Sequence, residues 1–123
     1  MKKILLTLVT LSLCHFVTCG HAASEWLPGF EDVPMMENTY VIQGAGFSYS
    51  QPDGKIVVED ISSDSVTRRQ FQRFFSDALR ELGWKLESNR RAGQKYTRDS
   101  DVLTIEILSE NPLKARFSLM PAK

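Results

Sequence analysis

The chain has 123 residues, of which 42% are hydrophobic and 24% are charged, and its formal net charge at neutral pH is zero. This length suits one small domain, and the composition is ordinary for a globular protein. The balanced charge argues against a nucleic-acid-binding protein, because such proteins carry a basic excess.

Residues 1–22 have the pattern of a secretory signal peptide. Lys2 and Lys3 supply a positive start, and residues 4–19 contain no Lys, Arg, Asp or Glu. This apolar stretch is shorter than the roughly 20 residues of a membrane-spanning helix. Gly20 and Ala22 place small residues at the −3 and −1 positions of a cleavage site. We therefore expect export to the periplasm by the general secretory route and a mature chain without a transmembrane segment.

Two alternatives to this cleavage stay open. The apolar segment could be retained as a membrane anchor, or Cys19 could be acylated as in a lipoprotein. Phe16 and Thr18 are poor neighbours for lipoprotein processing, so the sequence favours simple cleavage after Ala22.

Removal of the signal peptide changes the chemistry available to the protein. Both cysteines, Cys14 and Cys19, and both histidines, His15 and His21, lie in the removed segment. The mature chain then has no residues for a disulfide, a Cys nucleophile, a Ser-His-Asp triad or a Cys/His zinc site. We therefore expect the protein to bind no cofactor and no metal ion, and the sequence indicates no catalytic residue.

The charge of the mature chain is unevenly distributed. Residues 23–64 contain eight acidic residues and one lysine, a net charge of −7. Residues 65–123 contain twelve basic and seven acidic residues, a net charge of +5. An asymmetry of this kind can steer a charged partner toward one part of the molecule.

Residues 23–45 are predicted to form an irregular N-terminal arm. Prolines interrupt the apolar residues of 27–30 and 33–36, which excludes a regular helix there. The arm could be a strap whose apolar side chains lie on the surface of the domain, or a docking segment for a partner. The pattern favours the strap.

A β-hairpin is predicted next. Residues 47–50 and residues 55–61 alternate between apolar and polar side chains. Pro52-Asp53-Gly54 between them is typical of a turn, because Pro presets φ and Gly allows a positive φ.

The strongest pattern predicts a helix over residues 68–82. Thr67 and Gln70 form a capping box, and Gly83 stands where a left-handed residue ends a helix. Apolar side chains recur at helical spacing along one face: Phe71, Phe74, Phe75, Ala78, Leu79 and Leu82.

Short strands separated by turns are predicted after the helix. We expect strands at 84–87, 95–98, 103–107 and 115–119, with a polar loop over 88–94. Residues 46–123 are therefore predicted to form a single α+β domain. Its antiparallel sheet has about five or six strands, in the order ββαββββ, and one amphipathic helix packs on one face.

Arginines outside the apolar stripe suggest a binding surface. Arg69 and Arg73 lie on the polar face of the helix, and Arg90 and Arg91 lie in the loop predicted after the strand at 84–87. We interpret these four as partner-binding residues for an envelope protein or an anionic ligand, because Arg pairs with carboxylates and phosphates at two points. An ordinary solvated helix face is the alternative.

Carboxylates offer the remaining route to catalysis. Glu59 and Asp60 are adjacent in a strand, so we expect them on opposite faces, where they cannot cooperate. Asp99 and Asp101 could share a calcium ion or form a solvated turn. The sequence therefore favours a non-catalytic binding or accessory module of the cell envelope. The alternative is a small enzyme that uses carboxylates without metal or thiol chemistry.

Four stretches carry a resemblance to known proteins: residues 27–30, 52–58, 74–84 and 96–107. In this order they resemble a family of short, uncharacterised exported proteins from alphaproteobacteria. The resemblance implies a periplasmic α+β domain. It transfers no activity and no site residue, because the shared motifs are a turn, a helix end and an alternating strand.

Overall fold

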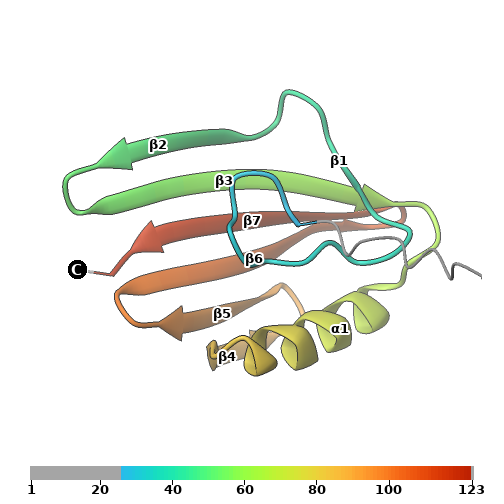
Figure 1. Cartoon of the computed structure of the whole chain (residues 1–123). Helices are drawn as coiled ribbons and strands as arrows, with labels where there is room; N and C mark the ends of the chain where they lie inside the picture. The colour runs from blue at the N-terminus through green and yellow to red at the C-terminus, as the bar shows by residue number, and fades with distance from the viewer. Residues whose placement is uncertain (1–25, 123) are drawn as a thin grey trace, which may run out of the picture.

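The computed structural model describes residues 26–122, so the expected signal peptide and its cleavage site lie outside the described residues. Within the described residues the chain forms seven strands and one helix, which follows the third strand (Figure 1). The elements are β1 (Tyr40–Val41), β2 (Phe47–Gln51), β3 (Gly54–Ser63), α1 (Arg68–Glu81), β4 (Lys85–Arg90), β5 (Gly93–Arg98), β6 (Asp101–Glu110) and β7 (Leu113–Pro121). Among residues 26–122, none of the helical structure is long and apolar enough to cross a bilayer.

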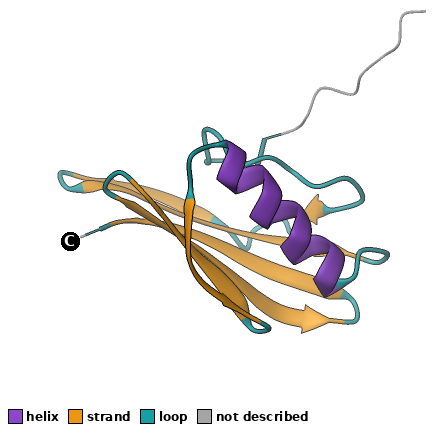
Figure 2. Cartoon of the chain, turned by 90° about the horizontal axis from the view of Figure 1, so that it is seen from below, coloured by secondary structure: helices purple, strands orange, loops and turns teal. Residues whose placement is uncertain are grey.

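All strands belong to one antiparallel sheet in the order β1-β3-β7-β6-β5-β4, and β2 pairs with β3. The helix lies across one face of this sheet (Figure 2). The predicted α+β class, with one helix on an antiparallel sheet, is confirmed. The strand count is higher than predicted, because Tyr40 and Val41 in the expected arm pair with Ser62 and Ile61.

The helix forms where its local signals predict it. Thr67 Oγ1 accepts a hydrogen bond from the Gln70 amide (3.1 Å), and the Thr67 amide donates to Gln70 Oε1 (3.0 Å). These reciprocal bonds satisfy amides that have no partner within the helix. Gly83 has a φ of 89°, which glycine adopts at little cost, and it turns the chain directly into Trp84 and β4.

The loop predicted over residues 88–94 is wrong. β4 continues to Arg90 and β5 begins at Gly93, so only Arg91 and Ala92 form the turn. The polar side chains of this segment have partners inside the fold: Gln94 is 3% exposed and donates to Ser76 Oγ (2.9 Å) and Asn89 Oδ1 (3.2 Å). Polar residues with tertiary partners can occupy strands that composition alone assigns to a loop.

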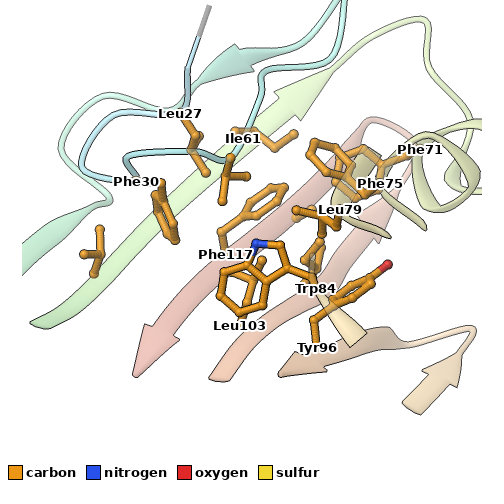
Figure 3. Packing of buried hydrophobic residues seen from close by; sticks show 14 of the residues in the cluster. Leu27, Phe30, Ile61, Phe71, Phe75, Leu79, Trp84, Tyr96, Leu103 and Phe117 are labelled. Atoms are coloured by element: carbon orange, nitrogen blue, oxygen red, sulfur yellow. The ribbon is translucent and has the colours of Figure 1, made fainter. Parts of the chain in front are cut away.

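The N-terminal arm contributes to the core instead of lying on its surface. Leu27, Phe30 and Val33 are each at most 3% exposed, and the Leu27 amide donates to the Val33 carbonyl (2.8 Å). Their side chains pack with those of the helix and sheet, including Phe117 (Figure 3). One short helix leaves part of a seven-stranded face uncovered, and the arm fills that area. Residues 26–45 and 46–122 therefore share one hydrophobic core, and the expected boundary at residue 46 does not separate two structural units.

Phe117 on β7 lies at the centre of this core. Its ring centroid is 5.0 Å from that of Phe75, 6.0 Å from that of Phe71 and 6.2 Å from that of Phe30. The helix, strand β7 and the arm therefore meet around the ring of Phe117.

Candidate partner-binding site

Gln72 attaches the first half of α1 to the end of β4. It is 8% exposed, and its Nε2 donates to the carbonyl oxygen of Arg90 (2.9 Å). One turn later, Ser76 accepts from Gln94 on β5 (2.9 Å). Because Gly83 reverses the chain, α1 and β4 run antiparallel, and the start of the helix lies beside the turn after β4.

These two hydrogen bonds show which side of the helix faces β4. At about 100° per residue, Arg69, Arg73 and Arg80 lie within about 40° of one another on the side next to Gln72 and Ser76. We call these three residues the helix row. Phe74 and Ala78 lie on the opposite flank of α1, so the helix row follows the β4 side of the molecule.

The structure brings the backbones of the four predicted arginines to one corner of the domain, where the side chain of Arg90 projects from the sheet face opposite the helix. Arg69 and Arg73 project from the first half of α1, and Arg90 and Arg91 belong to the adjoining end of β4 and its turn. All four are exposed, as expected for partner-binding residues. We call Arg69, Arg73, Arg90 and Arg91 the arginine cluster.

Three members of the arginine cluster carry unneutralised charge. Within residues 26–122, no carboxylate oxygen lies within 4.0 Å of Arg69, Arg73 or Arg90. Arg80, in contrast, pairs with Asp77 (2.9 Å). The three arginines therefore present donors to solvent without contributing an ion pair to this part of the fold.

Arg91 is tied to the fold through Glu110. Its Nη2 donates to both carboxylate oxygens of Glu110 (3.0 Å each), and Arg68 Nε donates to Oε1 of the same carboxylate (2.9 Å). These hydrogen bonds, those from Arg91 first, hold the pKa of Glu110 below its ordinary value. Arg68 was not among the predicted residues. Its spacing of four residues from Gln72 is the signal that places both side chains on one side of the helix.

A pocket lies beside the arginine cluster. It has a volume of about 610 Å³ and is lined by residues 63–68, Arg91 and residues 110–113. Three segments that are distant in the sequence meet here: the connection into α1, the turn after β4 and the turn between β6 and β7. The Arg68–Glu110–Arg91 contact forms part of the wall, and Asp64 also lines the pocket, so its two arginines are balanced by two carboxylates.

Replacing Glu110 with glutamine should lower the thermal unfolding midpoint at neutral pH. The lowered pKa means that the carboxylate stabilises the folded state above the ordinary value of 4.5, and that this stabilisation is lost as the pH falls through the folded-state pKa. The difference between wild type and variant should therefore shrink in acid and vanish once Glu110 is protonated in both states.

Unfolding midpoints measured from about pH 7 to about pH 3 check this result. Glu81→Gln is the control, because Glu81 is exposed and forms no ion pair with any residue in the described part of the chain. A midpoint difference for Glu110→Gln that stays constant over this range would contradict the proposed role of the ion pairs.

The carboxylates considered for catalysis are separated by the sheet. Glu59 pairs in register with Phe117 and so points to the helix-covered face, where burial raises its pKa. Asp60 points to the other face and binds Arg116 through two hydrogen bonds (2.8 and 3.0 Å). The expected opposite orientation of Glu59 and Asp60 is confirmed.

The turn that contains Asp99 and Asp101 gathers no further ligands. Over residues 26–122, no group of three or more His, Cys, Asp or Glu side chains is arranged to hold a metal ion. Among the sites considered in the sequence, the arginine cluster is the one whose members the fold brings together.

Comparison with known proteins identifies no relative: no family model, curated protein or solved structure matches the chain. The resemblance to exported alphaproteobacterial proteins stays a prediction. The site is therefore interpreted from its own geometry.

Proposed function

We propose that the mature chain is a non-catalytic binding module of the periplasm, which captures an acidic segment of another envelope protein through the arginine cluster. The observation that carries this proposal is that Arg69 and Arg73, exposed on neighbouring turns of α1, and Arg90, at the adjoining end of β4, have no carboxylate partner in the described part of the chain. Export is proposed from the signal-peptide pattern of residues 1–22.

The energetics of exposed arginines support a binding role. An exposed ion pair contributes about 0–1 kcal/mol to stability, so unpaired arginines on α1 add little to the fold. The same guanidinium groups pair with carboxylates at two points when a partner supplies them. A cluster of like charges also attracts an acidic partner over roughly the 8–10 Å Debye length at moderate salt.

Replacing Arg69 and Arg73 together with glutamate should weaken binding of an acidic peptide by about tenfold or more, which corresponds to about 1.4 kcal/mol or more. Stability should change by no more than about 0.5 kcal/mol, since both side chains are exposed and unpaired. Fluorescence anisotropy of a labelled Glu-rich peptide, at low and high salt, measures the affinity and its salt dependence.

The control compares the single variants Arg73→Glu and Lys114→Glu, which make the same change in net charge. Lys114 is exposed on β7, three strands from β4, on the sheet face that α1 does not cover. Equal losses of affinity in these two single variants would mean that net charge, and not the arginine cluster, determines binding. Binding of wild type to anionic lipid vesicles but not to the peptide would contradict a protein partner.

A further inference from the structure

β4 is a free edge of the sheet. Within residues 26–122 it pairs only with β5, and no strand lies on its other side. Alternate N–H and C=O groups of such an edge point away from the neighbouring strand and can pair with an added extended chain. The six residues of β4 span about 20 Å, enough for a short segment.

The helix row lies on the flank of α1 next to this edge. Arg69 and Arg80 are eleven positions apart, which is about 16 Å along a helix axis, close to the length of β4. Because α1 and β4 are antiparallel, Arg69 and Arg73 lie toward Arg90, and Arg80 lies toward Lys85. A strand added to β4 would present every second side chain to the helix row.

Basic residues also flank the other face of this edge. Lys85 pairs in register with Thr97, and Arg90 pairs with Gly93. Asn89 lies on the helix side, since its Oδ1 accepts from the buried Gln94, so Arg90 projects from the opposite side. Lys85 is offset by Glu87 of the same strand (3.8 Å), so the unpaired positive charge on this face lies at the Arg90 end. Acidic side chains of an added segment can pair there and, on the helix side, with Arg69 and Arg73.

The same charges oppose pairing of β4 with a second copy of the chain. Antiparallel pairing of two β4 strands about a twofold axis places the Arg90 end of one strand opposite the Lys85 end of the other, so basic residues of the two copies would face each other, which is unfavourable. A register shift between Leu86 and Ser88 interrupts the edge, so regular pairing with any added strand is confined to one part of β4. The regular part, Ser88–Arg90, is the end nearest the arginine cluster.

We infer that β4 binds an extended acidic segment of a partner protein by strand addition, with the exposed Arg69 and Arg73 beside the added strand. Backbone hydrogen bonds to β4 hold the segment, and its carboxylates pair with Arg69 and Arg73. This inference rests on the proposed function, whose site it extends from four arginines to the neighbouring edge.

The test uses a ten-residue peptide of alternating Glu and Thr and the same peptide with every backbone amide N-methylated. Methylation keeps the charge and removes the donors. The methylated peptide should bind the mature protein about tenfold or more weakly, because two lost backbone hydrogen bonds amount to about that factor. Amide hydrogen exchange along β4 should slow when the unmodified peptide is bound, whereas exchange along β2, at the other edge, should not change.

Equal affinity of both peptides, together with unchanged exchange in β4, would overturn strand addition and leave binding at the arginine cluster intact. Failure of both peptides to bind would overturn the proposed function and this inference together. Slower exchange in β2 and β4 alike would show general stabilisation on binding and would also overturn the assignment to β4.

Discussion

Replacing Phe75 with alanine should reduce the free energy of unfolding by about 3–5 kcal/mol. The side chain is 1% exposed, and its ring centroid lies 4.8 Å from that of Phe71 and 5.0 Å from that of Phe117. Small domains are stable by only about 5–15 kcal/mol, so this cavity would remove a large part of the total. Urea denaturation followed by circular dichroism measures the loss.

Phe47→Ala is the matched control, because Phe47 is 59% exposed on the edge strand β2. Its loss should stay within about 0.5 kcal/mol. Similar unfolding midpoints for wild type, Phe75→Ala and Phe47→Ala would show that Phe75 does not face the core.

Replacing Phe30 with alanine should also cost about 3–5 kcal/mol of unfolding free energy, although this residue lies in a segment without regular secondary structure. Phe30 is 3% exposed and makes an edge-to-face contact with Phe117 at 6.2 Å. Two further contacts join the arm to the sheet: Lys55 Nζ donates to the Gly29 carbonyl (3.0 Å), and Arg98 pairs with Asp32. If the arm were instead a docking segment that does not pack on the domain, Phe30→Ala would leave the free energy of unfolding unchanged.

Trp26→Ala provides the comparison within the arm, since Trp26 is 51% exposed. Chemical denaturation should show a small effect for this variant and a large one for Phe30→Ala. If Phe30→Ala unfolds at the wild-type denaturant concentration, the arm does not belong to the core in solution.

The helix and the first hairpin could be predicted from the sequence because their signals are local. The Thr67 and Gln70 side chains act within one turn, and the apolar stripe repeats over a few residues. Gly83 ends the helix through its own backbone conformation. Pro52-Asp53-Gly54 likewise fixes a turn between adjacent strands. Elements stabilised by residues close together in the chain can be predicted because those residues form a recognisable pattern in the sequence.

Tertiary contacts decided the parts that were mispredicted. Gln94 occupies a strand where Ser76 and Asn89 accept hydrogen bonds from its side-chain nitrogen, and neither partner is adjacent in the chain. Phe30 belongs to the core because α1 leaves part of the sheet uncovered next to Phe117. The type of a residue indicates which secondary structure it favours, whereas its burial depends on which part of the sheet the other elements leave uncovered.

For the candidate site, the sequence by itself determined the type and exposure of the residues. Four arginines outside the apolar stripe had to face solvent, since a buried unpaired charge is costly. Only the tertiary structure decided that they share a corner, that Glu110 pairs with Arg91 and Arg68, and that β4 is an unpaired edge next to the helix row. The physical reason is the sequence distance between the segments, because Gln72 and Arg90 meet through one side-chain hydrogen bond that no local pattern encodes.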